Sequence, residues 1–195
     1  LINKLTFGPA DTVNQVLIKN NIQGQIYIKD CDSWYDSLTK LTKGNFVSIG
    51  NLKNEKHIKR ISEKSFVKIN KYNSILSIIE KKITSNFFSA GMYAFSSSRE
   101  YIENFKLVRK ITKNEIYVSH VIMQMIYNNF NFKADFVNNL IDLGTLDDWN
   151  EYLYLNSNLI ISINQLFKIT NSTIELLISE KDFDLLKNKL LKSQK

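Results

Sequence analysis

Two acidic segments of this chain each follow a run of apolar, β-prone residues. Asp30 and Asp32 come after the run 26–29, and Asp142 comes after the run 136–141. An acid at the carboxyl end of a strand lies where open α/β sheets bind their ligands. Carboxylates from two such strands can hold one divalent cation, and Mg²⁺ takes oxygen ligands. The residues therefore favour a site that handles phosphate groups, the alternative being that each acid caps a loop or a helix.

Three other short segments contain residues suited to the same chemistry. Glu80 and Lys81 follow a predicted strand, where the lysine could meet a phosphate or simply form an exposed ion pair. Gly91 lies inside a predicted strand, which indicates either a bulge or the close approach of a ligand or another backbone. Gly144 permits a close backbone approach, and Thr145 can cap a following helix whose N-terminus favours anions.

Length and composition predict an ordinary globular protein. The chain has 195 residues, of which 44% are hydrophobic and 23% charged, enough for one domain with a real core. The single cysteine, Cys31, cannot form an internal disulfide, which fits a reducing compartment such as the cytoplasm. No apolar run approaches the roughly 18–20 residues of a membrane span, so no membrane-spanning segment is expected.

The net charge of +7 comes almost entirely from lysine. Of the 26 basic residues only Arg60, Arg99 and Arg109 are arginine, the side chain favoured for forked recognition of bases and phosphates. The lysines are also dispersed along the chain. We therefore expect the charge to attract small phosphorylated substrates, and a nucleic-acid-binding domain is the last of the alternatives.

The pattern of elements needed to position these residues predicts a mixed α/β fold. The order is one helix, several strands, two helices, a strand and a helix, typical of a partly parallel sheet with an antiparallel insertion. A further strand is expected at 159–163 and a last helix from Ser179. The predicted helices are 11–20, 97–108, 115–127 and 145–155, and the predicted strands are 25–29, 44–49, 65–69, 75–79, 87–95 and 132–136.

Five segments occur in the order and setting of motifs of the sugar-1-phosphate nucleotidylyltransferases, the nucleotide-sugar pyrophosphorylases. Gly8-Pro9-Ala10 resembles the Gly-x-Ala loop that lies against the nucleobase. Asp30-Cys31-Asp32 resembles the strand-end acid that ligates Mg²⁺, with Asp32 as the better match. Asp142-Leu143-Gly144-Thr145 resembles the Asp-x-Gly-Thr motif that supplies the second metal carboxylate. The resemblance implies that Asp32 and Asp142 hold Mg²⁺ and that Gly8 and Ala10 shape the base site.

The remaining two segments resemble the acceptor side of the same family. Glu80-Lys81 resembles the Glu-Lys pair whose lysine contacts the acceptor's phosphate and whose glutamate contacts the sugar. Gly91-Met92-Tyr93-Ala94-Phe95 resembles the Gly-x-Tyr-x-Phe strand beside the acceptor. The resemblance implies a catalytic role for Lys81 and substrate-binding roles for Glu80, Gly91 and Tyr93, together with Asp30.

The resemblance spans about residues 7–152 and implies a Rossmann-like mixed sheet, present here without its N-terminal portion. It implies transfer of NMP from an NTP to a phosphorylated acceptor, in bacterial surface-polysaccharide precursor synthesis. The family's Gly-x-Gly-x-Arg loop and following Pro-Lys, which bind the triphosphate, have no counterpart in this sequence. That departure leaves open an N-terminal segment or another chain that supplies the first part of the site, and a homo-oligomer also stays open. It also leaves open a catalytically incomplete module that binds a nucleotide sugar or a partner.

The C-terminal part departs from the family in a second way. In some relatives a phosphatase-like domain follows, and it opens with a strand carrying two Asp; the corresponding stretch 160–164 here has Ser162 and Asn164. We therefore expect residues 1–155 to form the nucleotidyltransferase-like domain and residues 156–195 to serve packing or interaction.

Overall fold

The computed structural model describes residues 5–37, 43–55, 58, 60–155, 167–169 and 174–176. The chain divides into two compact units, Leu1–Asp142 and Leu143–Lys195. None of the described helices has the length and apolar content that a membrane crossing requires. The assignment of residues 1–155 to one domain stays a prediction.

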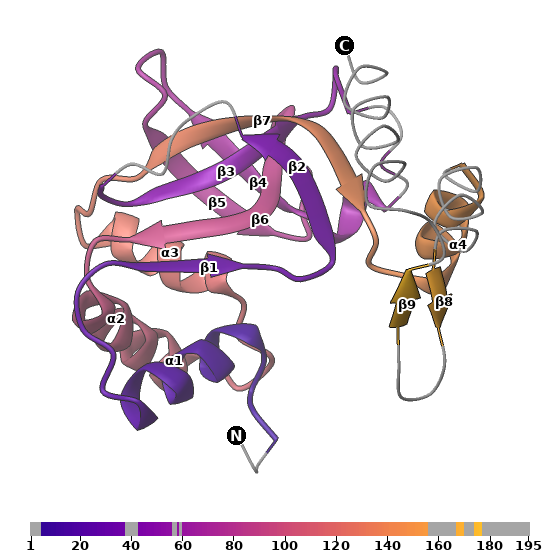
Figure 1. Cartoon of the computed structure of the whole chain (residues 1–195). Coiled ribbons are helices and arrows are strands. Elements are labelled where there is room, and N and C mark those ends of the chain that lie inside the picture. Colours follow the sequence, from indigo (N-terminus) through magenta and orange to yellow (C-terminus); the bar gives the residue numbers. More distant parts are fainter. Residues whose placement is uncertain are drawn as a thin grey trace. The chain divides into compact units, whose positions relative to one another are not determined.

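A mixed sheet of seven strands forms the centre of the first unit (Figure 1). Its path runs β2-β7-β3-β6-β4-β5. The strand β1 pairs with the edge of β6 that faces away from β3, along the part of β6 that β4 does not pair with. Among the described strands of this sheet, β3 and β7 pair in parallel and all other pairs are antiparallel. This confirms the predicted mixed α/β sheet. The strands are β1 (Ile26–Lys29), β2 (Ser33–Ser37), β3 (Phe46–Asn51), β4 (Ser65–Ile69), β5 (Ile75–Glu80), β6 (Phe87–Phe95) and β7 (Lys133–Asp142).

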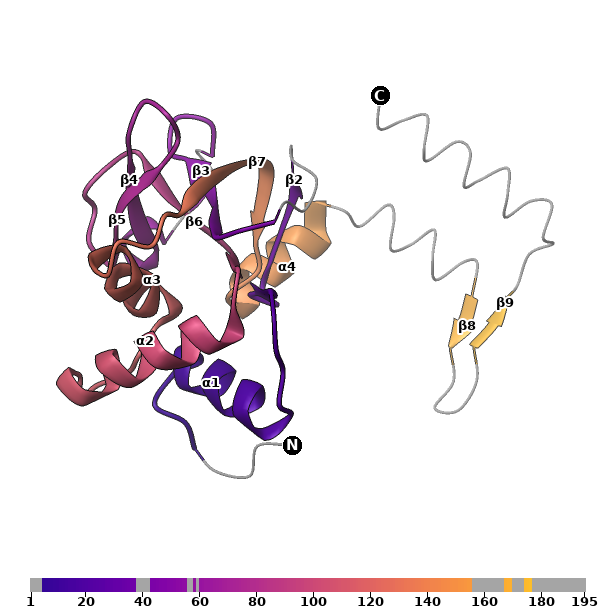
Figure 2. The ribbon, with the colours of Figure 1, turned by 90° about the vertical axis from the view of Figure 1, so that its left-hand side faces the viewer.

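Three helices lie on one side of this sheet (Figures 1 and 2). They are α1 (Pro9–Lys19), α2 (Ser98–Ile111) and α3 (Val118–Tyr127). Each turns an apolar stripe inward, as helical spacing of apolar residues predicts. The stripes and the facing strands form the main core, whose members include Tyr101, Phe105, Val121, Ile122, Met125, Val47, Ile49 and Phe95.

The opposite side of the sheet carries a smaller core. Phe66 on β4 and Phe88 on β6 are register partners and are fully buried. They pack with Ala90, Val137 and Leu140, and with partly buried residues that include Leu52, Ile58 and Ile61 from the segment between β3 and β4. Both faces of the central strands are therefore covered, which explains their nearly continuous apolar sequence.

The second unit contains the helix α4 (Leu146–Leu155) and a hairpin of β8 (Phe167–Ile169) and β9 (Ile174–Leu176). Thr145 caps α4 as predicted, because its Oγ1 accepts from the Asp148 backbone N–H at 3.2 Å. The Asp148 carboxylate accepts in return from the Thr145 backbone N–H at 3.1 Å. The predicted strand at 159–163 and the predicted helix from Ser179 lie outside the described residues.

Two strands next to the candidate site differ from the prediction. The strand β2 was not predicted, because its sequence Ser-Trp-Tyr-Asp-Ser mixes polar and aromatic residues directly after an acidic turn. The strand β7 joins the predicted strand 132–136 and the β-prone run 136–141 into one strand, which ends at Asp142. Two exposed asparagines interrupt its apolar alternation, and one of them, Asn139, has a positive φ of 53°. Both differences matter here because β2 and β7 pair with each other.

Candidate functional site

The two acids of the first segment lie in the tight connection between β1 and β2. The Lys29 ammonium closes this connection by donating hydrogen bonds to the Asp30 carbonyl, the Ser33 carbonyl and Ser33 Oγ, each at 2.7 Å. Burial lowers the pKa of Lys29, while the charges of Asp30 and Asp32 act in the opposite direction. Asp32 itself is exposed at the surface of the connection. Lys29 therefore fixes the backbone from which both carboxylates project.

Gly91 on β6 lies directly against Asp30. The Asp30 backbone N–H donates to the Gly91 carbonyl at 2.7 Å, and Gly91 has a φ of +82°. A Cβ at this position would lie 2.7 Å from Asp30 Oδ2 and 2.9 Å from Ser33 Oγ. The register between β3 and β6 also shifts at this level of the strand. Both interpretations of this glycine, a bulge and a close approach, are therefore confirmed, the approaching group being the Asp30 turn.

The Asp30 carboxyl group is shielded although the residue as a whole is exposed, because the carboxyl turns toward Gly91 and Ser33. Burial raises its pKa to about 6, and the negative charges of Asp32 and Glu80 act in the same direction. Lys29 and Lys64 oppose this rise. Asp30 therefore has a proton affinity well above that of an ordinary aspartate.

Asp142 is the last residue of β7, and it lies beside the β1–β2 connection. Its register partner on β2 is Ser33, the residue that follows Asp32. The two predicted metal ligands thus lie at the same end of one strand pair. Asp142 Oδ2 forms an ion pair with Lys64 Nζ at 2.5 Å, and the two side chains are 11% and 25% exposed.

The carboxylates of Asp32 and Asp142 are the kind of oxygen donors that Mg²⁺ prefers. Among the residues that the structure describes, no group of three or more His, Cys, Asp and Glu side chains could hold a metal ion. Mg²⁺ commonly completes its shell with water and substrate phosphates around one or two carboxylates. The two carboxylates therefore fit a metal site that substrate phosphates complete. A cation bound by Asp142 would have to share this carboxylate with Lys64.

Glu80 ends β5 and turns its carboxylate toward neighbouring hydroxyl groups. Its Oε2 accepts hydrogen bonds from Ser65 Oγ on β4 and from Ser119 Oγ on α3. Tyr93 on β6 is buried, and its hydroxyl accepts from Ser89 Oγ at 3.0 Å. Burial raises the pKa of Tyr93, and the nearby negative charges of Asp30 and Glu80 raise it further. Tyr93 is thus a neutral phenol within electrostatic reach of both acids.

Lys81 follows Glu80 in the chain, but the two side chains contact different partners. Lys81 has a positive φ of 52°, and its Nζ donates to the Tyr117 hydroxyl at 2.6 Å while lying 4.5 Å from the ring centroid. The Tyr117 hydroxyl donates in turn to the Glu115 carboxylate. The hydrogen bond with Tyr117 raises the pKa of Lys81, so its ammonium is charged at neutral pH. Lys81 is exposed and can turn to a ligand.

Gly8 and Ala10 lie at the start of α1 against the connection between α2 and α3. Gly8 has a φ of +109°, and a Cβ there would lie 2.6 Å from Glu115 Cγ and 2.8 Å from the Ile116 carbonyl oxygen. The Ala10 backbone N–H donates to the same carbonyl at 3.0 Å. Glycine is therefore needed at position 8 for both its backbone conformation and its contact with this connection.

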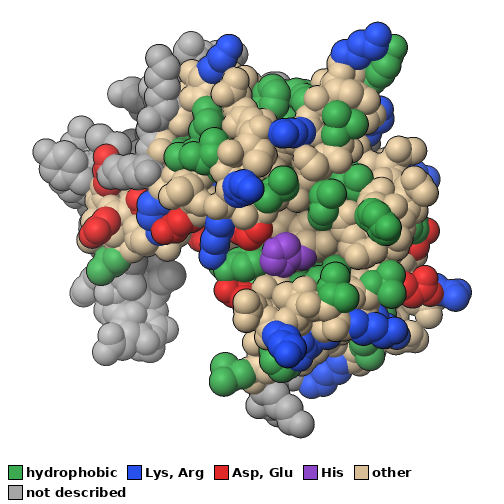
Figure 3. Space-filling model, turned by 180° about the vertical axis from the view of Figure 1, so that it is seen from behind, with side chains coloured by type: hydrophobic (Ala, Val, Ile, Leu, Met, Phe, Trp, Pro, Cys, Tyr) green, Lys and Arg blue, Asp and Glu red, His purple; other side chains and the backbone are tan. Residues whose placement is uncertain are grey.

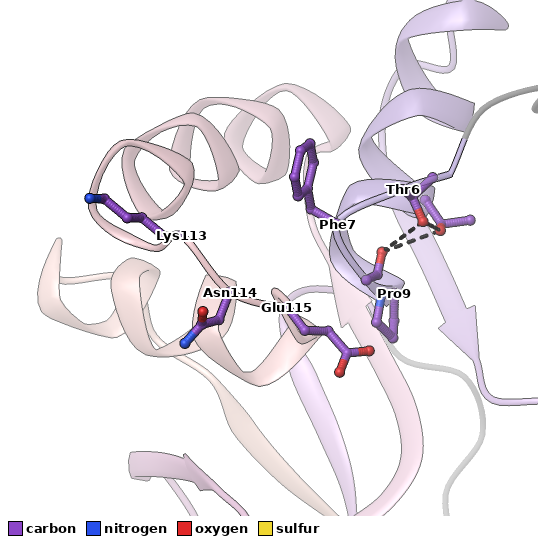
Figure 4. A pocket seen from close by; sticks show the side chains of 8 residues that line it. Thr6, Phe7, Pro9, Lys113, Asn114 and Glu115 are labelled. Carbon is purple, nitrogen blue, oxygen red and sulfur yellow. Dashed lines mark hydrogen bonds between the residues drawn. The ribbon is translucent and has the colours of Figure 1, made fainter.

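An open cleft of about 590 Å³ lies beside this loop (Figure 4). The Thr6 and Thr12 hydroxyls lie 2.8 Å apart, and the Thr12 hydroxyl donates to the Gly8 carbonyl at 3.2 Å. Because Glu115 lines the cleft and also accepts from Tyr117, the cleft and Lys81 are joined through one hydrogen-bonded chain. Its lining residues are Thr6, Phe7, Gly8, Pro9, Thr12, Lys113, Asn114 and Glu115.

Several residues of this region were not found from the sequence. Lys64, Tyr117, Glu115 and Ser119 belong to no recognisable motif. Only the register of the β4–β5 hairpin identifies Lys64, because the hairpin pairs Ser65 with Glu80 and so sets Lys64 opposite Lys81. On the face shown in Figure 3, basic side chains are scattered among hydrophobic and polar ones rather than gathered in one patch.

Comparison with known proteins gives two different results for sequence and structure. No family model matches the chain, and no curated protein matches its sequence. Solved structures do match. A nucleoside-diphosphate-sugar pyrophosphorylase from Vibrio cholerae RC9 gives a TM-score of 0.66 at 18% identity, over 78% of this chain and 67% of that one.

Two further structures agree with this match. The inositol-1-phosphate CTP transferase from T. maritima gives a TM-score of 0.60 at 17% identity, over 79% of this chain and 62% of that one. A UDP-glucose pyrophosphorylase solved with UDP-glucose gives 0.59 at 14% identity, over 81% of this chain and 65% of that one. The chain thus spans about two thirds of the length of these proteins. Its fold is that of the sugar-phosphate nucleotidyltransferases, which confirms the fold that the sequence resemblance implied.

Proposed function

We propose that the full-length protein transfers a nucleotidyl group from an NTP to a phosphorylated acceptor, such as a sugar 1-phosphate, and releases pyrophosphate. The observation that carries this proposal is the pairing of Ser33 with Asp142. It sets the acids Asp32 and Asp142 at one end of a strand pair, in a fold shared with enzymes of this class.

The proposed step needs positioning and charge neutralisation more than a protein nucleophile. An oxygen of the acceptor's phosphate forms a bond to the α-phosphorus of the NTP. The bond from the α-phosphorus to the oxygen that bridges to the β-phosphorus breaks, and pyrophosphate leaves with that electron pair. Lys81, charged and exposed, would exchange its contact with Tyr117 for the acceptor's phosphate.

The remaining site residues would bind and orient the substrates. Glu80 and Gly91 would shape the acceptor pocket, with Asp30 and Tyr93 beside them. Asp32 and Asp142 would hold Mg²⁺, which would supply neutralising charge for the phosphates of both substrates. This part of the proposal is supported by the oxygen-donor chemistry of the two carboxylates.

The cleft at Gly8 and Ala10 is proposed as the nucleobase site. Its support is the fixed loop geometry at Gly8 and the polar lining, including the side chain of Asn114, which offers both a donor and an acceptor. The triphosphate-binding loop of the family is not in this sequence. A segment outside this sequence, in the same protein or in a different chain, would supply that function.

We further propose a cytoplasmic role in making activated sugars for bacterial surface polysaccharides. The lone cysteine and the lysine-rich charge are compatible with such a compartment and with phosphorylated substrates. The sugar found in the product of the assay below would test the polysaccharide part of this role.

The test is a panel of NTPs combined with phosphorylated acceptors and Mg²⁺, assayed for pyrophosphate with the full-length protein. We expect one NTP and one acceptor class to give pyrophosphate and an equal amount of nucleotide sugar. Omitting the acceptor controls for simple NTP hydrolysis. If no pair gives product while the folded protein is present at high concentration, the proposed reaction is wrong.

One observation favours a second function, a module that binds nucleotide sugars without turnover. Asp142, a proposed metal ligand, is already paired with a lysine. A protein of this second kind would bind a nucleotide sugar such as UDP-glucose in calorimetry and give no pyrophosphate in the panel. The two experiments together separate the alternatives.

A further inference from the structure

The ion pair between Lys64 and Asp142 lies inside the proposed acidic site. The Nζ–Oδ2 distance is 2.5 Å, and neither side chain is more than 25% exposed. Partly buried pairs are screened less by solvent and salt than pairs on an open surface. The ammonium therefore neutralises this carboxylate in the resting protein.

The backbone of Lys64 is fixed on both sides, so the pairing is built into the fold. Its N–H donates to the Ile61 carbonyl at 3.2 Å, at the end of the short 3₁₀ helix η1 (Ile61–Glu63). Its carbonyl accepts from the Lys81 N–H at 3.1 Å, at the end of β5. A lysine anchored in this way loses less entropy on pairing than one on a mobile loop.

Lys29, the other lysine that lies near the acids, has a different role. Lys29 donates to the Asp30 carbonyl and to Ser33, and so uses its ammonium to hold the β1–β2 connection. Lys64 pairs directly with a carboxylate of the site and also acts electrostatically on Asp30. Its charge therefore stands in the region where a divalent cation would be attracted.

We propose that Lys64 is an internal counter-ion that competes with a divalent cation for Asp142, so that this carboxylate is fully available to metal only when Lys64 is drawn away. The phosphate of an arriving substrate is the group whose charge would draw the ammonium. This inference rests on the proposed function, which assigns Asp142 to a metal. It predicts that wild-type protein without substrate binds divalent metal weakly.

The test measures Mn²⁺ binding directly by electron paramagnetic resonance, in full-length protein without substrate. Lys64→Met should bind Mn²⁺ at least about tenfold more tightly than wild type, the factor expected if the lost pairing contributes ~1.4 kcal/mol. Lys68→Met is the matched control, because Lys68 is an exposed lysine on β4. It should leave the affinity unchanged. Lys64→Met with Asp142→Asn should lose the gain.

A second variant and a second readout keep the test decisive if Lys64→Met folds poorly. Lys64→Arg retains the positive charge and can pair with carboxylate, so it should bind Mn²⁺ no more tightly than wild type. Added Mn²⁺ should raise the melting temperature of Lys64→Met more than that of wild type, because tighter binding to the folded state stabilises it more.

Equal Mn²⁺ affinities of wild type and Lys64→Met would overturn this role for Lys64, even if the NTP panel gives product. A tightened affinity in Lys64→Arg would overturn it as well. A gain in Lys64→Met that Asp142→Asn removes would support the pairing even if the panel gives no product, and only the proposed reaction would then fail.

Discussion

Two lysines lie opposite each other at the open end of the β4–β5 hairpin, and their surroundings differ sharply. Lys64 is largely shielded and pairs with the carboxylate of Asp142. Lys81 is exposed and donates to the neutral hydroxyl of Tyr117. A shielded pair of opposite charges is costly to separate, whereas a hydrogen bond to a phenol at the surface is easily exchanged. The acidic side of the candidate site, at Asp142, is therefore neutralised at rest, whereas Lys81, on the proposed phosphate side, is accessible to a ligand.

The largest expected effect comes from the acidic side. Asp142→Asn removes the charge that the proposed reaction would use to hold Mg²⁺, and we expect turnover to fall by at least about a hundredfold, a usual loss for an electrostatic group of a reacting centre. The measurement is the initial rate of pyrophosphate release at saturating substrates. Asp36→Asn, an exposed acid on β2, is the matched control. Turnover of Asp142→Asn like that of wild type would remove Asp142 from the site.

On the phosphate side, the effect should be smaller and should fall mainly on binding. Lys81→Met removes an ammonium proposed to contact the acceptor's phosphate, and a charged hydrogen bond of this kind contributes ~1.5–3 kcal/mol. We expect the KM for the acceptor to rise roughly tenfold or more, with the KM for the NTP much less affected. The adjacent exposed residue gives the control, Lys82→Met. An unchanged acceptor KM would contradict the proposed contact.

A third prediction concerns the support of the acidic turn by β6. Gly91→Ala introduces a Cβ 2.7 Å from Asp30 Oδ2, at a residue with a φ of +82°. Gly24 has the same φ, but a Cβ there meets nothing within 4 Å. Gly24→Ala should therefore show only the backbone strain, of ~1 kcal/mol, and Gly91→Ala should lose a further ~1–2 kcal/mol of unfolding free energy.

Denaturant unfolding of the two variants measures this difference. The comparison isolates the contact with the turn, because both glycines have the same positive φ. Equal losses of unfolding free energy would show that the Asp30 turn moves aside at no cost. Glycine would then be needed at position 91 only for its positive φ.

The last prediction is a dependence of stability on pH. The pKa of Asp30 is raised from 3.8 to about 6 in the folded protein, mainly by burial of the carboxyl. As pH rises through this window, the unfolded chain releases the proton first, so the folded state loses stability relative to it. The side chain in Asp30→Asn does not titrate in this range. The melting temperature of this variant, relative to that of wild type, should therefore rise from pH 4 to pH 7.

Melting curves of wild type and Asp30→Asn at both pH values give the difference directly. The same pair of measurements on Asp36→Asn separates the Asp30 effect from a general change of charge. A gap between wild type and Asp30→Asn that is constant with pH would mean that the carboxyl is not shielded in solution.

Local sequence patterns predict much of this fold. The periodic apolar residues of α2 and α3 predict their helices because these segments bury one face against the core. The β-prone run of β4 predicts a strand, although the strand is buried on both faces, by Phe66 and by Val67. The strand β2 escaped prediction because it is stabilised by pairing with β7, which lies about 100 residues away in sequence. The continuation of β7 to Asp142 depends on the same pairing.

The site was predictable to a similar extent. Asp30, Asp32 and Asp142 stand out as acids at the ends of predicted strands, and Gly91 stands out as a glycine inside one. That the acids lie near one another follows from their positions at strand ends. Lys64 does not stand out, because it is one lysine among many and its importance comes only from the register of a hairpin. The direction of the Glu80 carboxylate, toward Ser65 and Ser119, likewise depends on how α3 packs beside β5.

The central claim is that a nucleotidyl group passes from NTP to the phosphate of an acceptor. The most direct measurement uses two parallel reactions, one with NTP labelled with ³²P at the α-position and one with NTP labelled at the γ-position, each incubated with full-length protein, Mg²⁺ and the acceptor identified in the panel. The account predicts that the α-label appears in the nucleotide sugar, that γ-label appears in pyrophosphate, and that Asp142→Asn gives neither. Label that remains in NTP, or that appears only as free NMP with or without the acceptor, would contradict it.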